Sequence, residues 1–282
     1  MNKVLVIGPT YKSEVIKIKD RLNSNSHFDC QYYNSLTGGS YSIACNLATF
    51  EVNTYFITRI ALDEDGNRML NYLETKNVIS SINNRMALKT ANRTYLFSNE
   101  DVKIFDDISY NCYPSLEDNI PSEFLMNTDY ILLNIQNNNF VNMLINRYRV
   151  RSKLVCCNCI VSNELLPYIE GIILDQQYLS TVVDSRNIDL FTSELLSKGI
   201  KFLLVIDKGK GVYIYTKNGN DYIGQQFSGN YYIGCYECFV AMFIASLANN
   251  ESFTTAINRA IQITNEFSYS KEFVLSDEMF DR

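Results

Sequence analysis

Short apolar runs alternate with helical patterns along most of this chain, and this alternation limits the folds that it can adopt. After residue 130 the elements follow in the order strand Tyr130–Ile135, helix Phe140–Tyr148, strand Lys153–Cys157 and strand Gly171–Leu174. Continuous apolar strands are typical of a sheet that is buried on both faces. Strands joined by helices of this length predict βαβ units, and therefore an α/β fold with a mostly parallel central sheet between two layers of helices.

The rest of the chain continues this alternation. The N-terminal run Val4–Ile7 ends at Gly8-Pro9, as a buried strand would. The other predicted elements are strands at Thr54–Ile57 and Phe202–Ile206 and helices at Tyr41–Phe50, Met69–Leu73 and Leu190–Leu196. Because the sequence shows no internal repeat, low-complexity segment or linker, we expect residues 1–282 to form a single domain.

Two stretches, within about 28–33 and 85–105, place apolar and polar residues in alternation. Such half-buried strands suit a small sheet with one face over a cleft better than they suit a buried central sheet. We therefore predict that these stretches form a small β lid. A second hairpin pattern lies at Val212–Ile223.

The composition indicates which classes of partner and which cellular compartment to expect. Hydrophobic residues make up 46% of the 282 residues and only 4 are proline, which indicates an ordered globular chain. A net charge of −6 argues against nucleic acid or an anionic membrane as the main partner. The most apolar stretch, Phe239–Ala248, is too short to span a membrane, and the apolar run after Met1 is too short for a signal peptide. We expect a cytoplasmic protein.

Eight cysteines offer an alternative chemistry. Three of them crowd one predicted strand: Cys156, Cys157 and Cys159. Side chains of a strand face opposite sides, so these three cannot converge on one metal ion. Cys235 and Cys238 form a C-x-x-C pair that could be a redox pair or half of a zinc site, but His27 is the only histidine. Buried cysteine in a reducing compartment behaves mostly as a small hydrophobe, which is the interpretation that we favour.

The chemically most telling segment is Gly234–Phe239, between a strand-like stretch and a strongly apolar helix. A glycine turn that opens a helix presents backbone N–H groups and the positive end of the helix dipole to an anion. Glu237 in that first turn could take a proton from an acceptor hydroxyl. These two functions together are what phosphoryl transfer requires. Taken alone, the segment could also be a simple helix start in which Glu237 complements the dipole.

The order of these features resembles that of the ribokinase-like (PfkB) carbohydrate kinases. The matching features are an initial strand followed by glycine, Gly38-Gly39 before a helix, lid strands, a late hairpin and a glycine turn that opens an apolar helix. Asp63-Glu64-Asp65-Gly66 looks like the family's G-x-D-x-x-G stretch, and the resemblance extends from Lys3 to about Ser270. It implies a ribokinase-like three-layer fold.

On the substrate side, the resemblance implies that Gly38 and Gly39 border the acceptor. The family's sugar-binding asparagine falls on Ile43, which can neither donate nor accept a hydrogen bond. Its first-loop aspartate falls near Ser13, which then becomes a candidate substrate contact, with Glu14 beside it as a possible substitute.

On the nucleotide side, the family's N-x-x-E motif aligns with Asp175–Tyr178, where the glutamate is missing but Asp175 could still bind a hydrated metal ion. The T-x-G-x-x-G loop aligns with Ile206–Gly211, which makes Lys208, Gly209 and Gly211 candidate nucleotide contacts. The lysines of this turn could contact phosphates or could simply be solvated. Both interpretations stay open.

The family's G-A-G-D signature aligns with Gly234, Cys235, Tyr236 and Glu237, so the resemblance gives the first three a role in nucleotide binding and makes Glu237 the general base. Glutamate is one methylene longer than aspartate, which moves the carboxylate by about 1.5 Å. The ring of Tyr236 could obstruct the anion hole or, if it is turned outward, leave the hole open.

The resemblance thus implies an ATP- and Mg²⁺-dependent kinase that acts on a hydroxyl of a sugar or sugar-like small molecule and that can form a homodimer through the β lid. The alternative is a degraded homologue that binds a small ligand or a partner protein and transfers nothing. The changes at Ile43, Tyr178, Cys235 and Tyr236 favour this alternative. A C-x-x-C oxidoreductase is a third, weaker hypothesis.

Overall fold

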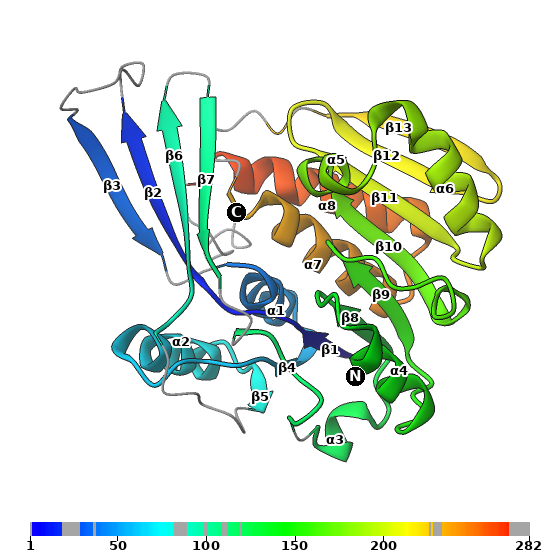
Figure 1. Cartoon of the computed structure of the whole chain (residues 1–282), viewed down its shortest axis with the longest axis horizontal. Helices are drawn as coiled ribbons and strands as arrows, with labels where there is room; N and C mark the ends of the chain where they lie inside the picture. The colour runs from blue at the N-terminus through cyan, green and yellow to red at the C-terminus, as the bar shows by residue number, and fades with distance from the viewer. Residues whose placement is uncertain are drawn as a thin grey trace.

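The computed structural model of the chain describes residues 2–18, 29–35, 38–81, 89–98, 101–108, 112–118, 120–225, 227 and 233–270. Among these residues it contains a nine-stranded sheet and a four-stranded sheet (Figure 1). The strands of the large sheet are, in order across it, β13 (Gly219–Gly224), β12 (Gly211–Thr216), β11 (Phe202–Asp207), β10 (Ile169–Asp175), β9 (Lys153–Cys157), β8 (Tyr130–Leu133), β1 (Lys3–Ile7), β4 (Asn53–Ile57) and β5 (Ile79–Ser81). Only the β11–β12 and β12–β13 pairs are antiparallel. The predicted mostly parallel α/β sheet is confirmed.

Helices cover both faces of the large sheet. Alternate residues of β1 point to opposite faces, so that Val4 and Val6 join one hydrophobic cluster while Leu5 and Ile7 join the other. The first cluster receives side chains from α1 (Ser40–Thr49), α2 (Glu64–Thr75), α7 (Cys235–Ala248) and α8 (Phe253–Ser268). The second cluster receives side chains from α3 (Ser122–Leu125), α4 (Asn138–Asn146), α5 (Gln176–Val182) and α6 (Ile188–Ser197). The result is the expected three-layer arrangement.

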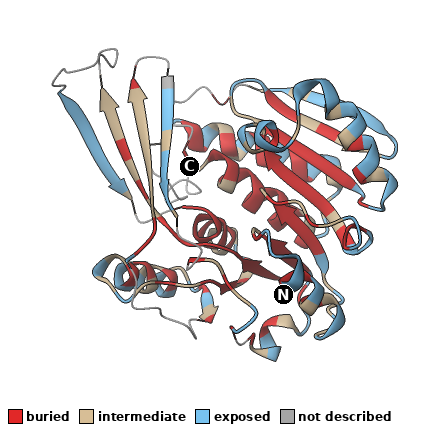
Figure 2. Cartoon of the chain, viewed as in Figure 1, coloured by how far each residue is buried: buried red, intermediate tan, exposed pale blue. Residues whose placement is uncertain are grey.

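Helix α7 lies at the centre of the first layer, where it packs against α1 and α8. Nearly all of its side chains are buried, which explains why its sequence lacks the polar stripe of a surface helix. Figure 2 shows the burial of α7 and of the neighbouring strands β9 and β10. Gly234 precedes the helix with φ 84°, a left-handed conformation that glycine adopts without steric cost.

The four-stranded sheet has the order β3 (Cys30–Ser35), β2 (Lys12–Ile18), β6 (Asn92–Ser98) and β7 (Asp101–Asp107). In Figure 1 it stands on the side of the large sheet toward which the arrowheads of β9 and β10 point. Strands β3, β6 and β7 fall largely within the two stretches expected to form the lid. Residues 28, 85–88, 99 and 100 of those stretches lie outside the described residues.

The structure differs from the sequence-based expectations at Ser13, at Cys159 and after Asp175. Ser13, which the resemblance placed in a first loop, lies in β2, a strand that pairs with both β3 and β6. Cys159 follows β9 instead of lying in it, so only Cys156 and Cys157 share that strand. Helix α5 was not expected; it begins where the side chain of Asp175 accepts a hydrogen bond from the Gln177 N–H.

No helix in the described part of the chain combines the length and the apolar character that crossing a bilayer requires. Within the same residues there is also no group of three or more histidine, cysteine or acidic side chains placed to hold a metal ion.

Candidate functional site

A cavity of about 420 Å³ lies between the two sheets. Its walls come from β6 and β7 of the small sheet, from the segments at the carboxyl ends of β8, β9, β10 and β11, and from the first turn of α7. Open parallel sheets bind ligands outside the carboxyl ends of their strands, because the loops that follow the strands meet at this edge. The position of this cavity makes it the candidate functional site.

Glu237 lines the cavity from the first turn of α7, beside Gly234. The first N–H groups of a helix have no acceptor within it, so this helix start offers donors and a positive dipole end to an anion in the cavity. Burial raises the pKa of the Glu237 carboxyl above its ordinary value, although the positive charges of Lys208 and Arg93 act in the opposite direction. A raised pKa makes this carboxylate a stronger proton acceptor.

The structure shows that the Tyr236 side chain is not turned outward. Its ring is turned inward, and its hydroxyl donates a hydrogen bond to the carbonyl oxygen of Ile173 in β10 over 2.7 Å. The residue still contributes to the cavity wall, but its polar end is held in the core. The neighbouring Cys235 is fully buried and does not line the cavity.

An ion pair lies in the cavity wall beside the turn that follows β11. The Nζ atom of Lys208 lies 2.8 Å from Oδ2 of Asp175, and both residues line the cavity. Asp175 is positioned by two further hydrogen bonds: its N–H donates to the side chain of Asn158, and its Oδ1 accepts from the Gln177 N–H. Burial would lower the pKa of the Lys208 ammonium, but the carboxylates of Asp175 and Glu237 outweigh this effect and raise it. Lys208 is therefore a cation fixed in the cavity wall.

The two glycines of the Lys208 turn have structural roles. Gly209 donates its N–H to the Asp207 carboxylate over 3.0 Å. Gly211 has φ 144°, and a Cβ atom there would lie 2.1 Å from the Ile223 carbonyl oxygen of β13. Neither glycine lines the cavity, so their contact with a nucleotide stays a prediction.

Of the three residues for which the resemblance implies a substrate contact, only Gly39 lines the cavity. Gly38 lies against the ring of Tyr11, and a Cβ atom added to Gly38 would approach that ring to 2.2 Å. Ser13 is buried in β2 and is absent from the cavity wall. A direct substrate contact by Gly38 or Ser13 therefore stays a prediction.

The sequence analysis missed a charged group on the small sheet. Arg93 of β6 forms a two-armed ion pair with Asp106 of β7, with N–O distances of 2.5 and 3.0 Å, and also donates to the Tyr11 hydroxyl over 3.0 Å. Tyr95 lies two residues further along β6, on the same face, and lines the cavity as well. The alternating pattern of β6 assigns Arg93 and Tyr95 to one face. What it lacks is any indication that this face borders the cavity.

Tyr178 takes the position of the family's glutamate and presents a phenol where the family has a carboxylate. Its hydroxyl accepts a hydrogen bond from the Gln136 side-chain amide over 3.0 Å. Asp175 is consequently the carboxylate of this motif that remains in the cavity wall.

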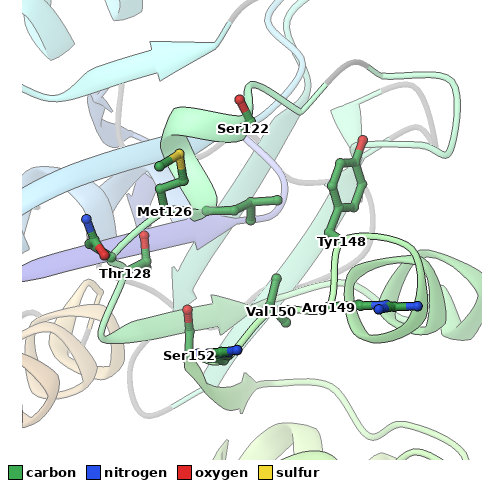
Figure 3. A pocket seen from close by; sticks show the side chains of 10 residues that line it. Ser122, Met126, Thr128, Tyr148, Arg149, Val150 and Ser152 are labelled. Atoms are coloured by element: carbon green, nitrogen blue, oxygen red, sulfur yellow. The ribbon is translucent and has the colours of Figure 1, made fainter.

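Two further cavities lack the features of a catalytic site. One of about 370 Å³ lies between the segments that follow α3 and α4, and Figure 3 shows Met126, Tyr148, Arg149 and Val150 around it. Its lining residues include no carboxylate and no histidine, and so no side chain that usually serves as a general base. The other, of about 820 Å³, lies at the amino ends of β8, β9 and β11, opposite the edge where parallel sheets bind ligands.

No family model and no curated protein matches this sequence. Solved structures do match. A ribokinase from Thermotoga maritima superposes with a TM-score of 0.78 at 14% identity, covering 100% of this chain and 98% of that one. A ribokinase from Giardia lamblia gives 0.78 at 14% identity with the same coverage. A ribokinase from Arabidopsis thaliana, solved in complex with ribose and ATP, gives 0.74 at 16% identity over 99% of this chain and 97% of that one.

These similarities cover the three-layer domain and the small sheet together, and they agree with the order of elements on which the resemblance in sequence rests. At such low identity the likeness establishes the architecture, not the activity. The chain has the fold of the ribokinase-like (PfkB) carbohydrate kinases.

Proposed function

We propose that this protein transfers the terminal phosphoryl group of ATP to a hydroxyl of a sugar or sugar-like small molecule. The observation that carries the proposal is the convergence of a half-buried carboxylate, a lysine held by an ion pair and a helix start on one cavity: Glu237, Lys208 and Gly234. The cavity lies at the edge of the sheet where ligands bind in such folds. Similarity to a ribokinase solved with ribose and ATP supports it further.

In the proposed reaction, Glu237 acts as general base. It takes the proton of the acceptor hydroxyl while that oxygen forms a bond to the γ-phosphorus and the bond from phosphorus to the ADP oxygen breaks. Lys208 and the first N–H groups of α7 would stabilise the negative charge of the transferring group. Both lie in the cavity wall before any ligand binds.

The residues present are compatible with a magnesium–nucleotide complex. Mg²⁺ in such sites keeps several waters and uses one or two protein carboxylates together with substrate phosphates, and Asp175 supplies one such carboxylate. The ion would neutralise phosphate charge. Because Asp175 pairs with Lys208, that lysine must shift its partner from Asp175 toward a phosphate when the nucleotide binds.

A second candidate function is a protein that binds a small ligand without transferring phosphate. The position of Tyr11 favours it, because the ring lies over Gly38 and Gly39, where the resemblance implied that the acceptor approaches the backbone. Tyr178 in place of the family's glutamate also favours a protein that does not transfer phosphate.

Titration calorimetry with ATP, in the presence and absence of Mg²⁺, separates the two candidates. For a kinase, ATP should bind, and Lys208→Met should weaken this binding strongly. Lys217→Met is a matched control, since Lys217 lies in the β12–β13 turn outside the cavity. If no heat and no thermal stabilisation appear at millimolar ATP and Mg²⁺, the kinase proposal fails and the ligand-binding proposal remains.

We also propose a homodimer formed through the small sheet and a cytoplasmic location. The sheet exposes several large hydrophobic side chains, which a second copy could cover: Tyr32, Tyr33, Val102 and Phe105. All eight cysteines are free thiols, which suits a reducing compartment. A monomer in light scattering would contradict the dimer.

A further inference from the structure

The cavity of about 820 Å³ lies at the end of the large sheet that is remote from the small sheet (Figure 1). Its lining comes from the amino ends of β8, β9, β10 and β11, the turn between β12 and β13, the end of α7 and the start of α8. It shares no lining residue with the cavity that contains Glu237. Its volume is in the range of small-molecule binding sites, so we asked which ligand its lining would suit.

Charged side chains follow one another along the strand edge of this cavity. Lys153, Glu170 and Lys201 stand at or next to the amino ends of the neighbouring strands β9, β10 and β11. Lys201 forms an ion pair with Glu170 over 3.0 Å. The other lining carboxylate, Glu251, is bound by Arg259, which lies outside the lining. Both carboxylates of the lining therefore already have a cation.

Lys217 continues this row of charges without a carboxylate of its own. In the antiparallel β11–β12 pair Phe202 lies opposite Thr216, so the next residues outward, Lys201 and Lys217, come to lie opposite each other. Like charges at directly opposite positions are unfavourable. Lys217 is exposed, and it has no ion-pair partner among the residues that the structure describes. A bound anion would compensate its charge.

The helix side of the cavity offers apolar surface. Leu247 of α7 and Phe253 of α8 line the cavity and are half-buried. The Phe253 ring packs against the rings of Phe202 and Phe243, with centroids 5.3 and 5.6 Å away, and these contacts hold it in place. An apolar part of a ligand would cover the remaining exposed area of Leu247 and Phe253 and exclude water from it.

The lining also limits the charge of the ligand. Its three lysines and two glutamates leave one net positive charge, which a single acid group balances. A ligand with several negative charges, such as ATP, would meet the carboxylates of Glu170 and Glu251 as well. The polar ribose of ATP would also gain little from the apolar surface. The cavity therefore suits a monoanion better than a nucleotide.

We propose that this cavity binds a small organic acid that has one carboxylate and an apolar ring or chain. The carboxylate lies at Lys201 and Lys217, and the apolar part covers Leu247 and Phe253. This second site is separate from the site of the proposed phosphoryl transfer, and its occupation can be measured in the absence of nucleotide.

The first test compares ligands by ligand-observed NMR titration of the full chain. Phenylacetate has both recognised groups, whereas phenethyl alcohol lacks the charge and acetate lacks the ring. We expect phenylacetate to bind at least about fivefold more tightly than either. Octanoate has a chain in place of the ring; binding of either acid supports the proposal, and the tighter of the two gives the shape of the apolar part. If neither acid binds, or if phenethyl alcohol or acetate binds as tightly as phenylacetate, the proposal is wrong.

A pair of charge reversals tests the position of the acid group. Lys217→Glu should weaken phenylacetate binding by at least about fivefold, because it replaces an attraction by a repulsion. Lys198→Glu is the matched control: it changes the net charge equally at an exposed residue that ends α6 outside the lining, and it should weaken binding by less than about twofold. Equal weakening by both variants would mean a general effect of surface charge. Unchanged binding by a folded Lys217→Glu variant would place the acid elsewhere, and either result overturns the proposal.

Discussion

The ion pair between Lys208 and Asp175 lies in the cavity wall, and removing one partner measures how much the pair contributes to the stability of the fold. The charged atoms are 2.8 Å apart, and the side chains are 28% and 11% exposed. At an effective dielectric constant of about 20, two unit charges at this separation attract each other by about 6 kcal/mol. The loss of water from both groups offsets most of this attraction, so the net contribution of the intact pair is small.

Removing only the cation has a larger effect. Lys208→Met leaves the Asp175 carboxylate in the cavity wall without its partner, and we expect the free energy of unfolding to fall by about 3 kcal/mol, the lower end of the range for a broken buried pair. The lower end applies because Lys208 keeps some contact with water. Adding Asp175→Asn removes the orphaned charge while preserving an acceptor for the Gln177 N–H at the start of α5. The double variant should return to within about 1 kcal/mol of the wild type.

A second ion pair between a lysine and a carboxylate, with a similar N–O distance, provides the control. Lys201 and Glu170 are 3.0 Å apart, but Lys201 is 69% exposed, so Lys201→Met should change stability by less than about 1 kcal/mol. The chain has no tryptophan, so urea unfolding is best followed by far-ultraviolet circular dichroism. The reasoning fails if Lys208→Met is no more destabilising than Lys201→Met, or if the double variant is less stable than Lys208→Met alone.

Three other changes test the catalytic base and the two structural contacts nearest the site. If the protein transfers phosphate, Glu237→Gln should lower turnover by about 10²–10⁴-fold and leave ATP affinity nearly unchanged, and an undiminished rate would put the base elsewhere. In the wild type, turnover should fall as the pH is lowered through the raised pKa of Glu237, with a midpoint above the ordinary glutamate value of 4.5, and Glu237→Gln should lack this dependence. Tyr236→Phe removes the hydroxyl that donates to the Ile173 carbonyl and should lower the free energy of unfolding by about 1 kcal/mol in urea titration; no change would mean that the bond adds nothing. Gly211→Ala forces a Cβ atom toward the Ile223 carbonyl oxygen and should lower the free energy of unfolding by more than about 1 kcal/mol. An unchanged melting temperature would show that the β12–β13 hairpin accommodates the methyl group.

The central sheet could be predicted because its signals are local. A buried parallel strand such as Lys153–Cys157 needs a continuous apolar run, and the chain supplies one at β1, β8, β9 and β11. The start of α7 is equally visible, since Gly234 and the apolar residues after it are adjacent in sequence. Local pattern is therefore enough to place Glu237 at the first turn of a helix.

The lid side of the site was less predictable because it depends on contacts between distant residues. Strand β2 mixes charged and apolar residues in Lys12–Ile18, and it becomes a strand by pairing with β6, about 80 residues later. Tyr11 reaches the cavity because Gly38 makes room for its ring. The sequence does not predict the contact between Tyr11 and Gly38, since an aromatic residue and a glycine pair each occur for many other reasons.

The direction of a side chain at a helix start is also decided by tertiary packing. Sequence alone left Tyr236 either blocking the anion hole or pointing outward, whereas the core offers it the Ile173 carbonyl oxygen as an acceptor. This hydrogen bond bears on whether Tyr236 closes the anion hole at the start of α7. A large residue in place of a small one need not close the hole when its polar end is satisfied inside the protein. The hypothesis of a protein that binds a ligand without transferring phosphate therefore depends less on Tyr236 than on Tyr178, which stands at the position of the family's glutamate, and on Tyr11, whose ring lies against Gly38 and Gly39.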